Sequence, residues 1–439
     1  MVGDTPCHPG PIPYDSLPVR LLTAVPLSLD ANSQGIHMTS KVVEVPAGLR
    51  LAPQAISAAK VRRQAMCSVT IGVAALFFPG SGASQQGRPI VLRPVNAVSE
   101  EGFSKVSSVR ELRDGSLLVA DQGEQRLVRV TFDSNIVAVL GRIGDGPAEV
   151  RSAGWLYPLA GDSTLFTDSS MSRWFILEGS RIVETIAEHG TLNRLLLSEL
   201  SGADEFGHVL GVRGSVFAGT GPRTRGTADS LVLLLADRHS QRVDTLGMLK
   251  GRGNRGFHTE RATNRQTMQL VVSTPLASED VALLFQDGWI AVARVEPYRV
   301  EWRAPNGRWS RGAPLPFQAI KVDDKQKCAA MERFFGRSNP CDPSRLPGWP
   351  DVVPPFLPAM LRTRLPALLA TPDGRLVVAR SPTATSPENR YDVVDRAGRL
   401  DGVIALGKQE VLIGFGARSV YVLIVDDDGI QNVRRHPWP

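Results

Sequence analysis

Asp114-Gly115-Ser116-Leu-Leu-Val-Ala120-Asp121 is the stretch of this 439-residue chain that indicates its architecture most clearly. A tight turn leads into a short apolar strand that ends at a charged residue. Arg126 follows after four more residues, where the next apolar run begins. An Asp-Gly pair favours a hairpin turn, and a continuously apolar strand is typical of one that is covered on both faces. The stretch therefore predicts a hairpin buried between neighbouring sheets.

Related units follow along the chain, and in each a turn leads into a short apolar strand that ends at a charged residue. These charged residues are Asp121, Asp168, Asp237, Arg294, Arg380 and Asp426. Units of a few strands that recur at intervals of tens of residues are typical of a closed radial array of blades. The six units therefore predict an all-β fold, a six-bladed β-propeller over residues 84–439, with long loops in the wider gaps.

The ring must also close between its last and first blades, because a closed array leaves no free sheet edge there. We expect Ile90-Val-Leu-Arg-Pro94 to complete the last blade by pairing with residues 429–435. Both ends of the chain are then needed for the fold.

Four residues separate the acid from the arginine in the first three units, a spacing that fits a hairpin loop. We expect the two charges to close the loop as a cross-strand pair, with the acid also accepting hydrogen bonds from the loop backbone. The expected structural pairs are Asp121 with Arg126, Asp168 with Arg173, and Asp237 with Arg242.

The fourth and fifth units differ, because Arg294 and Arg380 replace the acid. Each of these units therefore carries an arginine at both ends of its loop. If the two arginines share a face of the ring with the long insertion, we expect them to bind an anionic ligand.

The widest gap between units holds an insertion over residues 321–361. Residues 324–335 (DKQKCAAMERFF) are expected to form a short helix, and a proline-rich extended stretch follows. A long loop in a compact fold is usually functional, for example as a lid. We expect the ligand on this face, with Trp349 and Phe356 either contacting it or packing beneath the loop.

Cys328 and Cys341 lie thirteen positions apart within the insertion. An even number of cysteines in an exported protein is typical of a disulfide. Closing so short a loop contributes about 3 kcal/mol in the chain-entropy model. Two free thiols in the core are the alternative.

A leader for export is indicated by the basic residues Lys60, Arg62 and Arg63, the apolar run over residues 69–78, and small residues at Ser81 and Ala83. These are the three parts of a signal peptide, and the apolar run is only about half as long as a membrane span. We expect a signal peptide over residues 61–83 that is cleaved near Ala83, and a secreted or periplasmic protein. A buried strand or helix is the alternative.

Residues 1–60 contain eight prolines and show no period of 2 or 3.6. We expect them to be a non-native or disordered extension, with translation starting at Met66 or Val61.

The formal net charge of +6 does not indicate nucleic-acid binding. The arginines recur once per unit instead of forming a basic stripe, and no nucleic-acid-binding motif is present. The histidines after the leader are isolated, so we expect no metal site and no cofactor. We expect a monomer without a stable membrane span, whose partner is a protein, a peptide or a carbohydrate.

The segment from Phe103 to Asp121, followed by Gly141-Arg-Ile-Gly-Asp-Gly-Pro-Ala148, resembles bacterial six-bladed β-propellers related to NHL repeats. Tyr391-Asp-Val-Val-Asp-Arg-Ala-Gly398 is also similar to that group, and the likeness covers about residues 90–436. The resemblance implies the fold and an exported protein. It implies no defined activity, because a fold alone does not confer one.

Glu100-Glu101-Gly102 is faintly similar to the opening motif of calcium-dependent lactonases of the gluconolactonase kind, which are also six-bladed propellers. Phe103 stands where their proline belongs. The sequence therefore favours an exported binding or scaffolding module of unknown ligand over an enzyme. A calcium-dependent lactonase is the alternative, and calcium is a cofactor only in that case.

Overall fold

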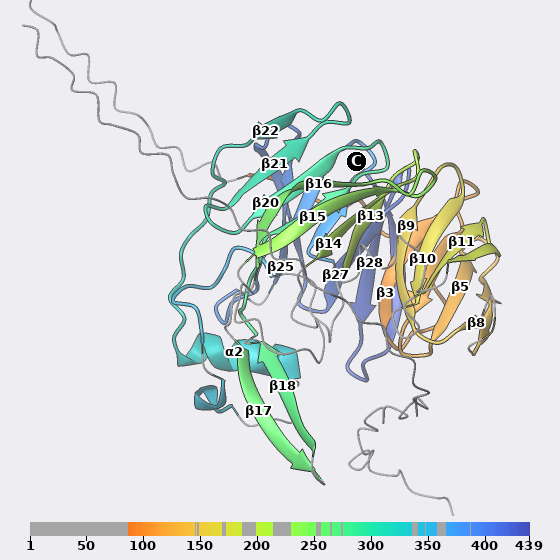
Figure 1. The fold of residues 1–439 in the computed structure, drawn as a ribbon. Helices are drawn as coiled ribbons and strands as arrows, with labels where there is room; N and C mark the ends of the chain where they lie inside the picture. The colour runs from red at the N-terminus through yellow and green to blue at the C-terminus, as the bar shows by residue number, and fades with distance from the viewer. Residues whose placement is uncertain are drawn as a thin grey trace, which may run out of the picture. The chain divides into compact units, whose positions relative to one another are not determined.

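The computed structural model describes residues 87–144, 146, 149–168, 173–186, 199–213, 230–251, 256–263, 266–273, 275–335, 341–346, 348–357, 366–386 and 388–439. The predicted extension (1–60) and signal peptide (61–83) lie outside the described residues. The described residues form a six-bladed β-propeller (Figure 1). The predicted fold class and number of blades are therefore confirmed.

Blades one to three are antiparallel sheets of four strands each, in which the chain runs from the innermost strand outward. Their strands are, for blade one, β3 (Val106–Glu111), β4 (Leu117–Asp121), β5 (Arg126–Thr131) and β6 (Ile136–Leu140); for blade two, β9 (Ala153–Pro158), β10 (Ser163–Asp168), β11 (Arg173–Glu178) and β12 (Arg181–Ile186); and for blade three, β13 (Glu199–Ala203), β14 (His208–Arg213), β15 (Ser230–Asp237) and β16 (Val243–Lys250).

Blades four to six follow the same order, and the innermost strands of all six blades contact their neighbours around the ring. Their strands are, for blade four, β19 (Val281–Leu284), β20 (Ile290–Arg294), β21 (Arg299–Arg303) and β22 (Trp309–Arg311); for blade five, β23 (Leu368–Ala370), β24 (Leu376–Ala379), β25 (Asn389–Val394) and β26 (Leu400–Leu406); and for blade six, β27 (Glu410–Phe415), β28 (Ser419–Val425) and β29 (Gln431–Pro437).

Residues near the front of the described chain complete blades five and six. β2 (Ala97–Val98) is the fourth strand of blade six and pairs antiparallel with β29. β1 (Arg88–Pro89) pairs parallel with β26 of blade five. The ring therefore closes as expected, but the expectation that Ile90-Val-Leu-Arg-Pro94 forms the closing strand is wrong. Ile90 and Leu92 instead pack against the apolar core between blades five and six, which leaves Ala97–Val98 to pair with β29.

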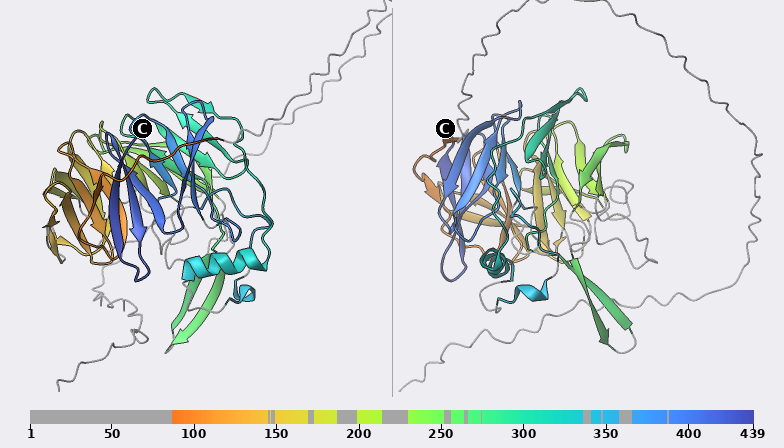
Figure 2. Two further views of the ribbon diagram at one scale, coloured as in Figure 1. Left: turned by 180° about the vertical axis from the view of Figure 1, so that it is seen from behind. Right: turned by 90° about the vertical axis from the view of Figure 1, so that its left-hand side faces the viewer.

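Smaller elements lie between the blades. β7 (Arg142–Ile143) and β8 (Glu149–Val150) pair in parallel between blades one and two, and β17 (Gly256–Thr263) and β18 (Gln266–Ser273) form a hairpin in the segment between blades three and four. The predicted helix in the insertion is present as α2 (Asp324–Phe335), and a short 3₁₀ turn, η1 (Pro343–Arg345), follows it (Figure 2). Within the described part of the chain, no helix is long and apolar enough to cross a membrane.

Six apolar cores lie between neighbouring blades and follow one another around the ring. Leu117 and Leu118 on β4 show how one strand contributes to two of them. Successive side chains of a strand point to opposite faces, so Leu117 packs toward blade six and Leu118 toward blade two. Both are fully buried, and burying one leucine contributes about 1.5–3 kcal/mol. The apolar runs of the repeated unit thus arise because each blade is covered on both faces.

The third repeat occupies a different hairpin from the first two. Asp121 and Asp168 end second strands, whereas Asp237 ends β15, the third strand of its blade. The alignment of Asp237 with Asp121 and Asp168 is therefore wrong. The Arg242 side chain pairs with Asp244 at 3.0 Å instead of Asp237. Hairpins at both ends of a blade use the same turn residues, so spacing alone does not distinguish them.

Candidate functional site

The innermost strands all begin at one face of the ring and end at the other. The face where they begin carries the segments that join one blade to the next, including α2, and is named the insertion face; Figure 1 shows α2 at this end of the blades. The opposite face carries the turns that follow the six innermost strands and is named the turn face. The predicted residues Arg294, Arg380, Trp349 and Phe356 belong to the insertion-face side.

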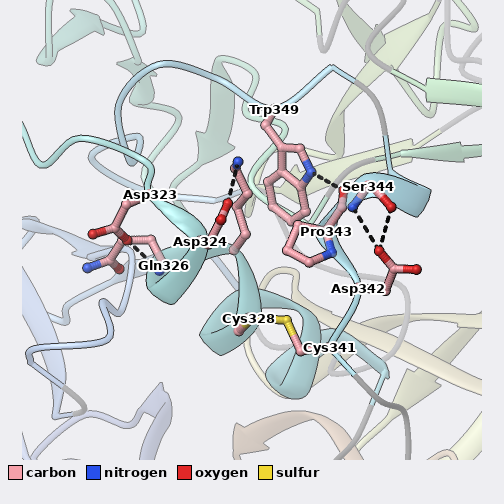
Figure 3. The surroundings of a disulfide bond; sticks show 10 residues. Asp323, Asp324, Gln326, Cys328, Cys341, Asp342, Pro343, Ser344 and Trp349 are labelled. Atoms are coloured by element: carbon pink, nitrogen blue, oxygen red, sulfur yellow. Dashed lines mark hydrogen bonds and ion pairs between the residues drawn. A yellow bond between two sulfur atoms is a disulfide. The ribbon is translucent and has the colours of Figure 1, made fainter.

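A disulfide joins Cys328 on α2 to Cys341, with their Cα atoms 5.3 Å apart (Figure 3). The predicted cysteine pair is therefore confirmed. The indole N–H of Trp349 donates a hydrogen bond to the carbonyl of Pro343 at 3.1 Å. Trp349 is half-buried and packs against a small apolar core beneath the insertion. The insertion is thus held together by its own residues.

Phe356 is fully buried in the core between blades four and five. Its ring centroid lies 6.0 Å from that of Tyr298, and its backbone bridges to Arg380. Sequence reasoning left open whether the two aromatics of the insertion touch a ligand or pack beneath the loop. The contacts of Phe356 and Trp349 are packing contacts.

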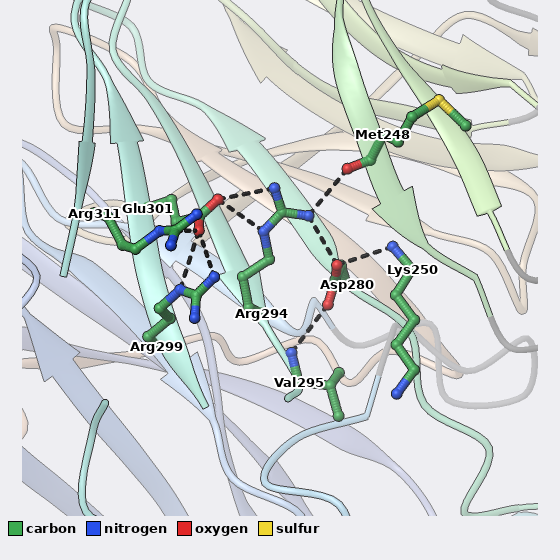
Figure 4. Close-up of polar contacts among 8 residues, drawn as sticks. All are labelled: Met248, Lys250, Asp280, Arg294, Val295, Arg299, Glu301 and Arg311. Carbon is green, nitrogen blue, oxygen red and sulfur yellow. Dashed lines mark hydrogen bonds and ion pairs between the residues drawn. The ribbon is translucent and has the colours of Figure 1, made fainter. Parts of the chain in front are cut away.

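Arg294 is held by two carboxylates (Figure 4). Its Nη1 lies 2.9 Å from Oδ2 of Asp280, and its Nη2 lies 2.8 Å from Oε2 of Glu301. Burial disfavours the charged guanidinium, but the hydrogen bonds to both carboxylates outweigh burial and raise the pKa of Arg294. The charge of Arg294 is therefore compensated within the protein.

Arg380 is compensated in the same way. Its Nη1 lies 2.7 Å from Oδ2 of Asp392, an oxygen that also accepts a hydrogen bond from the Tyr298 hydroxyl at 2.7 Å. The guanidinium lies over the Tyr298 ring, 5.2 Å from its centroid. That Arg294 and Arg380 bind an anionic ligand stays a prediction, and these contacts do not favour it.

One of the acids that compensate Arg294 occupies the same position in its unit as the acid that compensates Arg380. Glu301 follows Arg299 by two residues, and Asp392 follows Arg390 by two residues. Blades four and five thus replace the acid at the end of the second strand with an acid on the third strand. This acid, two residues after the second arginine of the unit, is a signal that sequence reasoning missed.

The acids of blades one and two are buried and bind the backbone. Oδ1 of Asp121 accepts a hydrogen bond from the N–H of Lys105 at 2.9 Å, and Asp168 binds the chain that enters β9 in the same manner. Arg126 and Arg173 lie opposite these acids in the strand register, with nitrogen-to-oxygen distances of 3.6 Å. These acids therefore fix the chain where it enters an innermost strand.

The residues of the faint lactonase likeness make other contacts. Glu101 pairs with Arg126 at 2.5 Å, and Glu100 accepts a hydrogen bond from the Asn135 side chain at 2.6 Å. Neither glutamate lines the central cavity described next. Among the described residues, no three histidine, cysteine or acidic side chains come together in a way that could hold a metal ion.

A cavity of about 940 Å³ is lined by residues of all six innermost strands or the segments next to them. It therefore lies along the axis of the ring. Arg294, Arg380, Trp349 and Phe356 are not among its lining residues.

Trp155 and Tyr157 contribute aromatic surface to this cavity. They lie two residues apart on β9, so their side chains leave the strand on the same side. The Tyr157 hydroxyl donates a hydrogen bond to the carbonyl of Leu200 at 2.8 Å, which fixes its ring against blade three. Both residues are half-buried, and they offer a ligand an apolar surface with a fixed position.

Arg110 and Glu111 lie at the end of β3 and contact opposite neighbours. The buried Arg110 guanidinium donates hydrogen bonds to the Gly161 carbonyl at 2.8 Å and to Oγ1 of Thr164 at 2.5 Å. Burial lowers the pKa of Arg110 to about 10. Glu111 accepts a hydrogen bond from the N–H of Ala417 at 3.0 Å. The two residues thus join blade one to blades two and six at the turn face.

Further contacts join the turns of blades two, three and four. The side-chain N–H of Gln286 donates to the carbonyl of Leu159 at 3.0 Å, and the backbone N–H of Glu205 donates to the carbonyl of Gln286 at 3.0 Å. Because Gln286 belongs to blade four and Leu159 to blade two, the bond passes the turn of blade three. These contacts fix the rim of the cavity at the turn face.

Sequence reasoning missed the cavity because the repeated unit leaves out the innermost strand: it covers the second and third strands of five blades, and the third and fourth strands of blade three. Outside blade three, the strand before the turn of the unit is the innermost one. Trp155 and Tyr157 lie just before the turn at residues 159–162. Their place before a turn was the sequence signal that they belong to an innermost strand and face the axis.

No family profile matches the chain, and no curated protein matches it in sequence. Similar solved structures include a Bacteroides fragilis protein inferred to be exported, with 10% identity, a TM-score of 0.42, and coverage of 81% of this chain and 99% of that one. The calcium-binding protein regucalcin from Agrobacterium tumefaciens is another, with 11% identity, a TM-score of 0.36, and coverage of 81% of this chain and 97% of that one. Virginiamycin B lyase from Staphylococcus aureus has 9% identity, a TM-score of 0.37, and coverage of 77% of this chain and 97% of that one. The chain is therefore distantly similar to proteins of different function, and the likeness does not indicate what it binds or converts.

Proposed function

We propose that this protein is an exported binding module whose ligand occupies the central cavity. The observation that carries the proposal is the cavity of about 940 Å³ lined from all six blades. Sites for small ligands are typically concave, about 300–1,000 Å³ in volume, and mostly apolar with a few placed polar groups. The volume of this cavity and its aromatic pair, Trp155 and Tyr157, fit that description.

The contacts at the insertion face support the choice of the cavity over that face. Arg294 and Arg380 are each compensated by carboxylates of the protein. Phe356 is fully buried, and Trp349 packs within the insertion. A ligand at the insertion face would have to displace these contacts, whereas the cavity is already formed.

Export is supported by the disulfide between Cys328 and Cys341. Structural disulfides persist in oxidising compartments and are rare in the cytosol. The leader-like pattern over residues 61–83 agrees with this. N-terminal sequencing of the protein recovered from the periplasm or the medium would test it, and a protein found only in the cytosol would contradict it.

The binding proposal is tested with the Trp155→Ala variant. We expect a screen of peptides and oligosaccharides to find a ligand that raises the melting temperature of the wild-type protein. Because Trp155 lines the cavity, its removal should weaken that ligand at least tenfold, equivalent to about 1.4 kcal/mol. Isothermal titration calorimetry measures the change.

Trp309→Ala is the matched control, because Trp309 lies on the outermost strand β22 and is 40% exposed. It should leave the affinity unchanged. A ligand that binds Trp155→Ala as tightly as the wild type, but loses affinity when Trp349 is replaced by alanine, would place the site on the insertion face and contradict the proposal.

A further inference from the structure

The outer part of blade four is strongly basic. From Ile290 to Arg311 the chain contains five arginines, two glutamates and no other charged residue. The structure describes every residue of this stretch. Five positive and two negative charges give it a formal charge of +3, and the side chains of β21 and β22 carry most of that charge.

Glu301 on β21 is shared by three of these arginines (Figure 4). Its Oε1 lies 2.8 Å from Nη2 of Arg299 and 3.2 Å from Nε of Arg311, and its Oε2 lies 2.8 Å from Nη2 of Arg294. Arg294 has a second carboxylate in Asp280. Arg299 and Arg311 therefore share the single charge of Glu301, and the Arg311 side chain, 72% exposed, reaches the surface.

Arg303 and Trp309 lie beside this group. They stand directly opposite each other on β21 and β22, two residues along the strands from the pair of Glu301 and Arg311. Residues that are opposite each other or two apart share one face of a sheet. Arg303, Trp309 and Arg311 therefore point to the same side of the blade.

The guanidinium of Arg303 and the ring of Trp309 are both open to a partner. Among the described residues, no carboxylate forms an ion pair with Arg303. Arginines lie over the rings of Trp289 and Phe132, at 4.7 and 4.9 Å from the centroids, whereas no described arginine lies over Trp309. The Trp309 side chain is 40% exposed. Arg308, in the turn between the two strands, is exposed as well.

Protection of the sheet edge accounts for only part of this arrangement. β22 is the outermost strand of blade four, and no described strand pairs with its far edge. Charged residues on an edge strand hinder pairing with another sheet, and Arg311 meets that need. An exposed tryptophan does not, because apolar surface on an edge favours association. Trp309 next to free arginines therefore indicates a surface that recognises a partner.

An acidic sugar matches both parts of this surface. A pyranose ring has a flat side of C–H groups that packs against an exposed indole, and a carboxylate or sulfate on the same sugar accepts paired hydrogen bonds from a guanidinium. An acidic peptide offers the charges without the flat apolar side. Single-stranded nucleic acids use several aromatic rings along a basic groove, whereas Trp309 is the one exposed ring on the described strands of blade four.

We propose that the outer edge of blade four, formed by Arg303, Arg308, Trp309 and Arg311, binds an acidic polysaccharide through its carboxylate or sulfate groups. None of these four residues is among the described residues that line the central cavity. The inference therefore adds a second site to the proposed function and does not depend on the cavity.

The test uses two pairs of polymers that share a backbone and differ in charge: polygalacturonate with its methyl ester, and dextran sulfate with dextran. Their affinities for the purified protein are measured by isothermal titration calorimetry at low and high salt. We expect an anionic polymer to bind about tenfold tighter than its neutral counterpart, and the pair that shows the difference identifies the acidic group. Salt should weaken this binding, because it screens charges.

Arg303→Gln and Trp309→Ala should each weaken the anionic polymer several-fold, because each removes one part of the surface. Trp309→Phe keeps an aromatic ring and should retain more of the affinity than Trp309→Ala. The matched control is Arg181→Gln, which removes an arginine with a 78% exposed side chain from β12, the outermost strand of blade two. It should leave the affinity unchanged, and unchanged melting temperatures show that the variants are folded.

Equal affinities within both pairs of polymers, no binding of either anionic polymer, or an unchanged affinity in Arg303→Gln or Trp309→Ala would each overturn the inference. Tighter binding of polyglutamate or of an oligodeoxynucleotide would assign the edge to another class of partner and overturn it as well. The cavity is tested separately, because a ligand of the cavity loses affinity in Trp155→Ala and not in Trp309→Ala.

Discussion

Asp121 accepts hydrogen bonds from the backbone N–H groups of Lys105 and Gly123, at 2.9 and 3.1 Å, while it is itself fully buried. In blade four, Asp280 takes the equivalent acceptor role, and its partner Arg294 stands where Asp121 stands in blade one. A buried charge is tolerated when it is paired and hydrogen-bonded. The side chain at one position of the repeat can therefore be acidic in one blade and basic in another, as long as its partner carries the opposite charge.

Glu301 is the residue whose titration should be visible in the stability of the fold. Burial alone would raise the pKa of Glu301, but hydrogen bonds from Arg299 and Arg294 outweigh burial and lower the pKa below its usual value. Because the folded pKa lies below the unfolded value of about 4.3, the ionised carboxylate stabilises the fold above that pH. This contribution is lost as the pH falls through the folded pKa.

Glu301→Gln should therefore lower the free energy of unfolding by about 2 kcal/mol at pH 7. The difference from the wild type should shrink on acidification below the unfolded pKa, as measured by urea unfolding at a series of pH values. Glu388→Gln, at an exposed acid, should change stability by less than about 0.5 kcal/mol throughout. A difference between wild type and Glu301→Gln that stays constant on acidification would show that the carboxylate charge is not the cause.

At the level of strands and helices, the sequence predicted the parts whose signals are local. The helix over residues 324–335 and the pairing of Cys328 with Cys341 are both confirmed. Asp237 was assigned to the wrong hairpin because turn chemistry is the same at both ends of a blade. The cavity was missed because its lining is defined by which strand of a blade lies innermost, a property of the assembled ring and not of the repeated unit.

The disulfide should stabilise the insertion. Replacing Cys328 and Cys341 together by serine should lower stability by about 3 kcal/mol, since it frees a short loop in the unfolded chain. Reducing the wild-type protein with dithiothreitol should give the same loss, as followed by chemical unfolding. The double serine variant provides the control, because dithiothreitol should leave it unchanged. Equal stability of the oxidised and reduced wild type would contradict this assignment.

For the whole molecule, six apolar cores in a ring mean that every blade is supported on both sides. The closing strand β2 and the apolar residues before it belong to this ring, since Ile90 and Leu92 pack against the core between blades five and six. The sequence predicted a ring of six blades closed by both ends of the chain. It did not predict the closing strand correctly, because a two-residue strand gives no periodic signal.

Deletion of residues 87–98 should lower the free energy of unfolding by about 3 kcal/mol or more, because it removes two partly buried apolar side chains and a strand pairing. Thermal and urea unfolding measure the loss. Removal of the exposed Pro439 is the control at the other end of the chain and should have no effect. If the shortened protein were as stable as the wild type, the front segment would not be needed to hold the ring.

The pairing of β2 with β29 also sets an order of events during synthesis. A ribosome makes the chain from its front end at about 5–20 residues per second, so β2 waits through the production of five blades before its partner exists. Until β29 emerges, the chain can form separate sheets but cannot lock them together. If the protein is exported as proposed, the ring closes only after the chain has crossed the membrane. The translocation machinery then transports a chain that is not yet fully folded.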